Sequence, residues 1–333
     1  TYAELMITYV ARLTVISAIQ LLAITILAFL VIHLAPGEPT VLQQDLQARA
    51  TGAQRETLRQ LYGLDKPLHV QYWNWLNRIV RLDLGRSFLP DGRPVWEKIR
   101  ERIPVTLALN LIEVCIIYLI AVPLGVFAAV RRHSFFDRVT TVFVFLGFAT
   151  PDFWLALLLM ILFGVQLGWL PISGLRSLNW EYLAPLAQAW DLLSHLILPI
   201  FIGAFGGLAG LSRFMRGSML EVIRQDYIRT AQAKGLPARA VLYKHALRNA
   251  VLPIVTILGL SLPGLIGGSV IVESIFAIPG MGQLAVQSVF ARDYPVVMGL
   301  LTITAGLTLV GNRLADMCYG IVDPRIRIAG RKT

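Results

Sequence analysis

The chain has 333 residues, of which 56% are hydrophobic and 15% are charged, and its formal net charge is +10. Soluble domains carry about 25% charged residues, so this composition excludes an ordinary soluble protein and predicts a polytopic membrane protein. The positive charge does not indicate nucleic-acid binding, because the basic residues lie in short segments between apolar stretches, as topology signals do.

Six apolar segments predict six transmembrane helices. The first, residues 13–35, is predicted to be an uncleaved helix, because it is longer than a signal-peptide core and no small-residue cleavage site follows it. The other five are predicted at residues 105–130, 139–170, 195–211, 251–272 and 295–319, and Pro151 breaks the third.

Charge placement predicts the orientation of these helices. Basic residues concentrate at residues 131–138, at residues 213–248 and in the tail, whereas the loops at 171–194 and 273–294 carry one each. The positive-inside rule therefore places both termini in the cytoplasm.

The predicted domain organisation follows from this topology. Residues 1–35 hold the N-terminus and the first helix, and residues 36–104 form an extracytoplasmic domain, which as a long loop is largely exempt from the charge rule. Residues 105–320 form the core with helices two to six, and residues 321–333 are a cytoplasmic tail.

The cytoplasmic stretch between the fourth and fifth helices, with a predicted coupling loop at residues 215–250, has helical signals. Ser218 with Glu221 three residues later predicts a capping-box start, and Gly235 followed by Pro237 predicts a helix stop. A second helical pattern follows. A short ordered element of this kind either rests on anionic lipid headgroups or docks a soluble partner, and both interpretations stay open on these residues alone.

Motifs of intrinsic catalysis are missing from the sequence. It has no phosphate-binding loop, no zinc-protease motif and no serine-hydrolase motif, and its five histidines have no ligand spacing. Its two cysteines lie in apolar segments and are predicted to be buried apolar residues. We therefore expect no catalytic residue, no metal site and no cofactor in this chain.

Two predicted spans carry glycines at the spacing used for close helix packing. Gly203 and Gly207 lie four residues apart in the fourth span, and Gly264 and Gly268 do so in the fifth. Small residues let helices approach closely in lipid, so these glycines predict either a contact within the chain or a subunit interface.

Three acidic residues lie at or near membrane depth, namely Glu113, Asp152 and Glu273. A charge at the centre of the bilayer costs about 2.5–3.5 kcal/mol on insertion scales, so each is predicted to face protein or a water-filled translocation path. A proline break frees backbone groups that line a cavity or are buried. We therefore hypothesise that Asp152 borders the path and attracts an amine-bearing substrate. Glu113 also fits a partner inside the helix bundle or a protonated carboxyl group.

Residues 227–236, Y-I-R-T-A-Q-A-K-G-L, and residues 245–253, H-A-L-R-N-A-V-L-P, resemble the cytoplasmic loop of permease subunits of binding-protein-dependent ABC importers. The similarity is to the dipeptide, oligopeptide and nickel class. Arg229 and Thr230 stand where the wider family has Glu and Ala, a departure that is itself typical of the peptide class. Further matches, in the same order along the chain, include D-L-G-R-S-F at 83–88, T-P-D-F-W at 150–154 and R-D-Y-P at 292–295.

The resemblance implies an all-α fold with six transmembrane helices, an outer domain after the first helix and a cytoplasmic coupling helix between the fourth and fifth. It implies a bacterial or archaeal cytoplasmic membrane, and a second homologous permease subunit as a heterodimeric partner. It also implies two ABC ATPase subunits that hydrolyse ATP in place of this chain, and an extracytoplasmic substrate-binding protein. The outer domain and the loop at 273–282 would meet that binding protein or close the outer end of the path.

The resemblance further implies a set of ATPase-coupling residues at the loop: Tyr227, Ile228, Arg229, Thr230, Ala231, Lys234 and Gly235. The expected cargo is a dipeptide or oligopeptide, and relatives of similar sequence that carry nickel chelates or other small solutes keep those cargoes as alternatives. Three rivals from other classes are an ATP-independent secondary transporter, an intramembrane enzyme and a scaffold that only anchors the ATPase.

Overall fold

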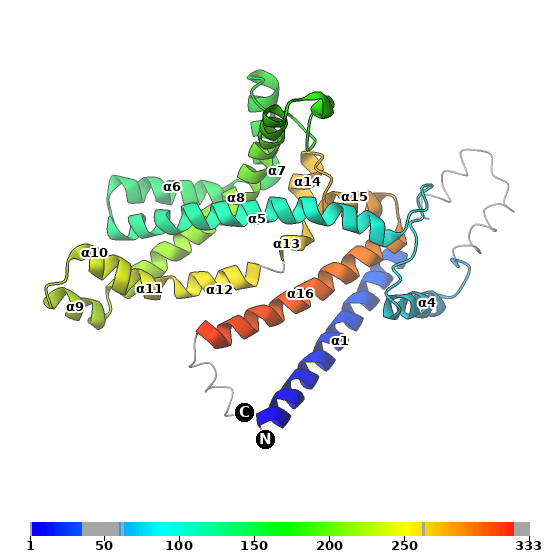
Figure 1. Cartoon of the computed structure of the whole chain (residues 1–333), viewed down its shortest axis with the longest axis horizontal. Coiled ribbons are helices and arrows are strands. Elements are labelled where there is room, and N and C mark those ends of the chain that lie inside the picture. The colour runs from blue at the N-terminus through cyan, green and yellow to red at the C-terminus, as the bar shows by residue number, and fades with distance from the viewer. Residues whose placement is uncertain (1, 35–59, 61–62, 262–263, 323–333) are drawn as a thin grey trace. The chain divides into compact units, whose positions relative to one another are not determined.

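A computed structural model describes residues 2–34, 60, 63–261 and 264–322 (Figure 1). The described residues are helical and hold no named strand; an isolated bridge pairs Arg86 with Pro94. The elements in chain order are α1 (Tyr2–Leu34), α4 (Leu68–Val80), α5 (Val95–Val130), α6 (Phe135–Ala149), α7 (Asp152–Leu159), η1 (Met160–Gln166), η2 (Trp180–Tyr182), α8 (Pro185–Ile223), α9 (Asp226–Ala233), α10 (Ala238–Ala240), η3 (Val241–Ala246), α11 (Leu247–Ala250), α12 (Leu252–Ser261), α13 (Gly264–Gly267), α14 (Val270–Ile275), α15 (Met281–Phe290) and α16 (Tyr294–Val322).

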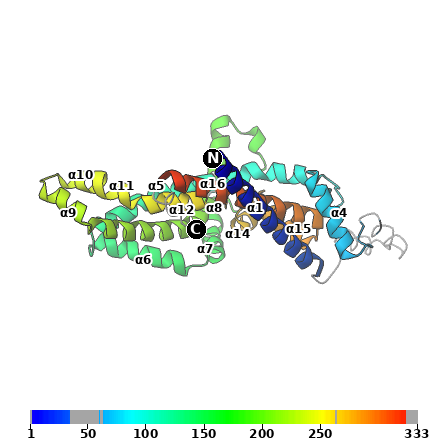
Figure 2. The same cartoon turned by 90° about the horizontal axis from the view of Figure 1, so that it is seen from below.

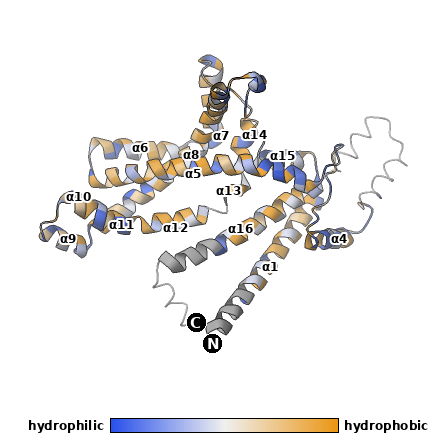
Figure 3. Cartoon of the chain, in the orientation of Figure 1, coloured by the Kyte–Doolittle hydropathy of each residue, from blue (hydrophilic) through white to orange (hydrophobic). Residues whose placement is uncertain are grey.

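Five helical stretches within the described residues are long and apolar enough to cross a membrane, or six if one bent pair counts as a span. The bent pair joins α6 to α7 and η1 at an angle of 102° and takes the place of the predicted third span. The bend follows from Pro151, which directly precedes α7 and has an extended backbone. The other candidate spans are Thr14–Leu34, Val95–Val130, Pro185–Ile223, Leu252–Ile275 and Tyr294–Arg313. Figure 3 shows the apolar character of α5, α8 and α16.

The chain divides into two compact units. Unit 1 comprises residues 1–104 and 280–310 and includes α1, α4, α15 and the first turns of α5 and α16. Its apolar core is built from two turns of α5 and from α15 and α16; the buried side chains are Val95, Ile99, Met281, Leu284, Val296 and Leu300. Gly299 permits the close contact at Val95, because a Cβ atom there would lie 2.8 Å from the Val95 side chain.

Unit 2 comprises residues 105–279 and 311–333, and α8 is its central element. Helix α6 lies alongside α8 in both views (Figures 1 and 2). Helix α5 also packs closely on α8, because a Cβ atom at Gly125 would lie 2.6 Å from the Ser212 carbonyl oxygen. The sequence predicted the fourth span at residues 195–211, and α8 is longer at both ends because polar residues at its ends continue the helix.

Candidate functional site

The predicted coupling segment is a run of short helices between α8 and α12. Helix α9 is followed by a turn at Gly235 and then by α10, η3 and α11, and α9 contacts η3. The expected second helix of this segment is therefore found at Ala238–Ala240 and the turns that continue it.

Helix α9 ends in a Schellman motif. The Gly235 amide donates to the Gln232 carbonyl at 2.9 Å, and the Leu236 amide donates to the Ala231 carbonyl at 3.4 Å. Gly235 has φ +74°, a left-handed conformation that glycine adopts without the strain of a side chain. The predicted role of Gly235 in the turn thus has a defined geometry.

One side of α9 packs into the core of unit 2. Ile228 and Ala231, three residues apart and 1% and 7% exposed, lie in an apolar cluster with Met219, Val241 and Ala246. Residues three apart share one helix face, so this face is covered by the chain itself. In this conformation Ile228 and Ala231 are therefore not on an open contacting face, where the sequence interpretation had put them.

The other side of α9 is open to a partner. Tyr227, Arg229, Thr230 and Lys234 are exposed. The Arg229 side chain is 72% exposed and its guanidinium lies 3.5 Å from the Asp226 carboxylate, an exposed pair of the kind that contributes little to stability. The Tyr227 hydroxyl accepts a hydrogen bond from Asn249 at 2.8 Å. The guanidinium of Arg229 thus remains available to an acidic group outside the chain.

The predicted helix start at Ser218 is wrong. Ser218 lies inside α8, which continues to Ile223, and α9 begins after Gln225 without a side-chain cap. The amide groups around Ser218 are already within a helix, so its hydroxyl makes a different bond, donating to the Ala250 carbonyl at 2.7 Å. This bond ties α8 to the end of α11, so the coupling segment is fastened at both ends.

Asp137 and Arg216 form a second fastening between α6 and α8. Arg216 Nε and Nη2 donate to the two carboxylate oxygens of Asp137 at 2.7 and 3.0 Å. Asp137 also accepts from the His133 amide at 3.0 Å, and its own amide donates to the Ser134 hydroxyl at the start of α6. Two parallel bonds to one carboxylate fix both distance and orientation, so α6 and α8 are held in register at this end.

A polar stripe runs along α5 in unit 2. Thr106, Asn110 and Glu113 are all buried, and their spacing of four and three residues puts them on one helix face. Thr106 donates to a Glu273 carboxylate oxygen at 2.8 Å, and Asn110 donates to the Leu265 carbonyl at 2.7 Å. The stripe thereby binds α5 to α13 and α14, in the region where the fifth span is broken.

Glu113 lies at the end of this stripe and is 8% exposed. Among the described residues its Oε1 atom has no hydrogen-bond partner. The carboxyl group fills the space over Gly203 of α8, because a Cβ atom there would overlap it. Gly207 similarly accommodates Ile117. Gly203 and Gly207 therefore make contacts within the chain.

The remaining predicted residues lie apart from this packing. A Cβ atom at Gly264 would meet no atom within 4 Å, and Gly268 has φ +75°. Asp152 is exposed in the first turn of α7, next to the 102° bend. Glu273 is fully buried. Asp152 is therefore the only one of the three predicted path carboxylates that is exposed in this conformation.

In unit 1 the loop that precedes α5 is held by a buried polar network that no sequence argument had identified. The Ser87 hydroxyl and the Phe88 amide both donate to the Asp293 carboxylate, the latter at 3.0 Å. Lys98 of α5 donates to Ser87 Oγ at 2.8 Å and pairs with Asp91 at 2.8 Å. The network joins two sequence motifs that are 206 residues apart.

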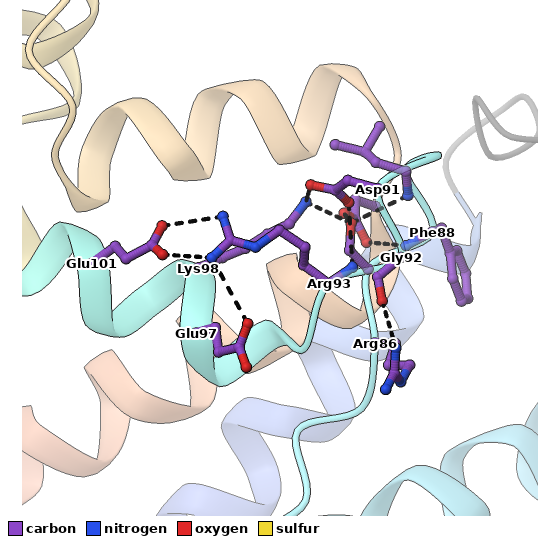
Figure 4. Close-up of polar contacts among 11 residues, drawn as sticks. Arg86, Phe88, Asp91, Gly92, Arg93, Glu97, Lys98 and Glu101 are labelled. Atoms are coloured by element: carbon purple, nitrogen blue, oxygen red, sulfur yellow. Dashed lines mark hydrogen bonds and ion pairs between the residues drawn. The ribbon is translucent and has the colours of Figure 1, made fainter.

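A shell of charged residues surrounds this network (Figure 4). Arg93 pairs with Glu101 through two hydrogen bonds of 2.5 and 3.2 Å, and its guanidinium lies 3.8 Å from Glu97. Arg86 donates to the Gly92 carbonyl at 3.1 Å. These contacts close the loop on itself and on the first turns of α5.

The two aspartates of the network have opposite pKa shifts. Burial acts to raise the pKa of Asp91, but its hydrogen bond to Lys98 and the positive charges of Lys98 and Arg93 lower it below 3.8. Burial raises the pKa of Asp293, although the hydrogen bond from Ser87 opposes this shift. The ionised Asp91 side chain thus stabilises the network. Ionised Asp293 is unfavourable in its buried position, and the hydrogen bonds from Ser87 and Phe88 compensate for part of that cost.

The chain matches two family models that together cover most of its length. Residues 121–328 match the inner-membrane component of binding-protein-dependent transport systems, and residues 6–110 match the N-terminal part of such membrane components. The chain belongs to this permease family. It is therefore a multi-pass protein of the cytoplasmic membrane.

Relatives of this permease cover nearly its full length. It is 46% identical to the oligopeptide transport system permease protein AppB of Bacillus subtilis over 96% of this chain and 99% of the relative. It is 37% identical to a probable peptide ABC transporter permease protein of Sinorhizobium fredii over 96% of this chain and 99% of that relative. The family resemblance predicted from the sequence is confirmed.

Proposed function

We propose that this permease forms part of the translocation path of an ATP-driven peptide importer and that separate ATPase subunits drive it through α9. The observation that carries the proposal is the two-sided character of α9. One side is fixed into the core of unit 2 by Ile228 and Ala231, and the other side exposes Tyr227, Arg229, Thr230 and Lys234. A helix with one exposed side and one buried side can pass a displacement caused by a docked ATPase subunit on to the membrane spans against which it packs.

A movement of α9 would reach the membrane spans through contacts of the coupling segment with α8 and of α8 with α6. The Ser218 bond to Ala250 and the apolar cluster that contains both Met219 and Ile228 join the coupling segment to α8. The Arg216 pair with Asp137 then joins α8 to α6. A transport switch requires that the moving element has different contacts in its two states, and a docking ATPase that changes shape on binding ATP supplies that difference.

The proposed partners complete the machine. They are two ABC ATPase subunits on the cytoplasmic side, a second homologous permease and an extracytoplasmic binding protein that meets the outer loops. Both termini of this chain lie in the cytoplasm in this arrangement, as the charge distribution predicts. The membrane is that of a bacterium or archaeon.

The proposed cargo is a dipeptide or oligopeptide, which is supported by relatives named as oligopeptide and peptide permeases. Asp152, exposed beside the bend, borders the path in this proposal and favours a cargo with a free amino group. Replacing Asp152 with Asn should therefore slow uptake of a cationic peptide more than that of a neutral one. If the Asp152→Asn variant changed uptake of both peptides by the same factor relative to the parent, Asp152 would not belong to the path. Nickel chelates and other small solutes remain the alternative cargoes.

Charge reversal at the exposed guanidinium tests the docking role. In proteoliposomes that contain the complete complex, Arg229→Glu should lower ATP-dependent uptake by about tenfold, which corresponds to about 1.4 kcal/mol of lost coupling. The matched control is Arg132→Glu, an equal charge change at an exposed residue between α5 and α6. Equal uptake by the two variants would contradict the docking role of α9. Uptake driven by an ion gradient without ATP would favour a secondary transporter instead.

A further inference from the structure

Unit 1 contains a cavity of about 490 Å³ that the transport proposal does not use. Its walls come from the last turns of α1, the segment before α4 that includes Lys66, one face of α4, the loop after α4 and the first turns of α16. The α4 face consists of Gln71, Asn74, Trp75 and Arg78, which recur at the three- and four-residue spacing of one helix side. Ligand pockets typically measure about 300–1,000 Å³, so the cavity has the size of a small-molecule or headgroup site.

The charges that line the cavity select an anion. The lining contains three cationic side chains, those of Lys66, Arg78 and Arg86, and one carboxylate, that of Asp83. Within the described part of the chain no ion pair engages these cations, and Asp83 accepts a hydrogen bond from the Gly85 amide at 2.9 Å. The excess of positive charge next to apolar walls raises the local concentration of anions.

A hydrogen-bond donor in the cavity wall lacks an acceptor. The Trp75 Nε1 atom is buried and has no partner among the described residues. Leaving a buried donor unpaired costs about 1–3 kcal/mol, so native structures provide an acceptor from protein, water or ligand. Because Trp75 lines the cavity, a small turn of its ring on ligand binding brings this donor to an anionic oxygen in the cavity.

Aromatic rings form another part of the cavity wall. The Phe29 and His33 rings stack with centroids 3.9 Å apart, and the Tyr294 ring lies 4.8 Å from His33. Phe88 lies 6.2 Å from Tyr294 and also lines the cavity. The preferred ligand therefore carries its anionic group on an apolar body.

The position of the cavity along the spans identifies the ligand. Phe29 and His33 lie in the last two turns of the candidate span Thr14–Leu34, and Tyr294 begins the candidate span Tyr294–Arg313. Where a span ends, the hydrocarbon of the bilayer gives way to phosphate headgroups. Helix α4 also exposes Trp73 and Val80, at 67% and 76%, and an exposed apolar face beside basic residues is typical of a helix lying in that interface.

We propose that this cavity binds the headgroup phosphate of an anionic phospholipid. Arg78 and Trp75 Nε1 donate to the phosphate oxygens, Lys66 and Arg86 balance the charge, and the acyl chains follow the apolar surface of the adjoining spans. The lipid is thereby bound specifically to unit 1 and does not exchange freely with the surrounding bilayer.

Lipid titration of the purified, delipidated complex tests the proposal. Phosphatidylglycerol, phosphatidylcholine and inorganic phosphate are added separately, and bound lipid is counted by native mass spectrometry. Arg78→Gln should weaken phosphatidylglycerol binding at one site about tenfold, the loss of one charge-assisted contact. Arg81→Gln, an exposed residue one position beyond α4 and outside the cavity, is the matched control and should bind within about twofold of the parent. Trp75→Phe keeps the ring and removes the donor, so it should show a smaller loss in the same direction.

Three results would overturn the proposal. The first is identical lipid binding by the Arg78→Gln and Arg81→Gln variants. The second is full competition by inorganic phosphate at the lipid concentration, which would make the site one for free phosphate. The third is loss of affinity for the substrate-binding protein without loss of lipid, which would make the cavity a protein docking site. None of these measurements depends on transport, so the test is separate from that of the coupling proposal.

Discussion

The guanidinium of Arg216 donates two hydrogen bonds, of 2.7 and 3.0 Å, to the carboxylate of Asp137, and this pair joins α8 to α6. The Asp137 side chain is almost fully buried and that of Arg216 is mostly buried. Removing one partner of a buried pair leaves an uncompensated charge, which makes such pairs more costly to break than surface pairs.

Breaking this pair should destabilise the permease. We expect Arg216→Met to lower the free energy of unfolding by about 3 kcal/mol, because it leaves the Asp137 carboxylate buried without its cation. Thermal unfolding of the purified permease measures this loss. The matched control is Asp226→Asn, which removes the exposed partner of Arg229 and should change stability by less than about 0.5 kcal/mol. An equal loss in the free energy of unfolding in both variants would mean that the buried pair stabilises the permease no more than the exposed pair does.

Glycine packing gives a second prediction. Gly203→Ala should destabilise the permease by about 1 kcal/mol, because the flexible end of the buried Glu113 side chain has to move aside for the added methyl group. Gly206→Ala is the control on the same helix, since a Cβ atom there meets nothing within 4 Å in this chain. If Gly206→Ala instead released the second permease during purification, Gly206 would belong to the subunit interface. Unchanged stability of Gly203→Ala would contradict the α5–α8 packing described here.

The buried polar network of unit 1 predicts that stability depends on pH. Because the folded pKa of Asp91 lies below its ordinary value of 3.8, its contribution is present above that value and is lost as the pH falls through the folded pKa. The contribution is about 1 kcal/mol or less, since the Asp91 side chain is 42% exposed and water screens it. Asp91→Asn should therefore lower the thermal midpoint at neutral pH and lose less stability on acidification than the parent.

Asp293 should act in the opposite sense. Its folded pKa is raised, so its carboxylate opposes folding above the folded pKa, and the parent gains stability as the pH falls from the raised pKa toward 3.8. Comparing Asp91→Asn and Asp293→Asn over the same pH series separates the two contributions. The interpretation fails if both variants change the pH profile in the same direction.

The turn after α9 gives a prediction about transport. Gly235→Pro should abolish uptake while the protein stays in the membrane, because proline cannot adopt a φ of +74° and lacks the amide that donates to Gln232. Ala231→Asp should do the same by placing a carboxylate in the apolar cluster around Ile228. Uptake is measured with the complete complex, and membrane content by quantitative blotting. Retained uptake in either variant would count against a coupling role for this segment.

The sequence predicted the helices better than their contacts. Long apolar segments and Pro151 were enough to place the spans and the break in the third, because hydropathy and a missing amide act locally. The helix start predicted at Ser218 was wrong because the Ser-x-x-Glu pattern also occurs inside long helices. There the backbone amides are already hydrogen-bonded and need no capping side chain. Burial of Ile228 and Ala231 was missed for a related reason: a short motif does not show which side of its helix the rest of the chain covers.

The buried polar network of unit 1 was not predicted, for a different reason. Ser87 and Asp293 lie in segments that both looked typical of the family, yet nothing local pairs residues 206 positions apart. The spacing of Thr106, Asn110 and Glu113 predicts a shared helix face, but their partners at Leu265 and Glu273 come from the folded arrangement of a broken span. Long-range polar pairs of this kind emerge only from the structure.

Site-directed cross-linking decides whether the exposed side of α9 meets an ATPase. Cys115 and Cys318 are first replaced with Ser, and Thr230→Cys or Ala231→Cys is then introduced into the complete complex. The exposed cysteine at position 230 should cross-link to an ATPase subunit in high yield, with a yield that changes on ATP binding, whereas the buried neighbour at 231 should react little. A position-230 cysteine that reacts only with lipid-soluble or water-soluble reagents, and never with a nucleotide-hydrolysing subunit, would contradict the coupling role proposed for this helix.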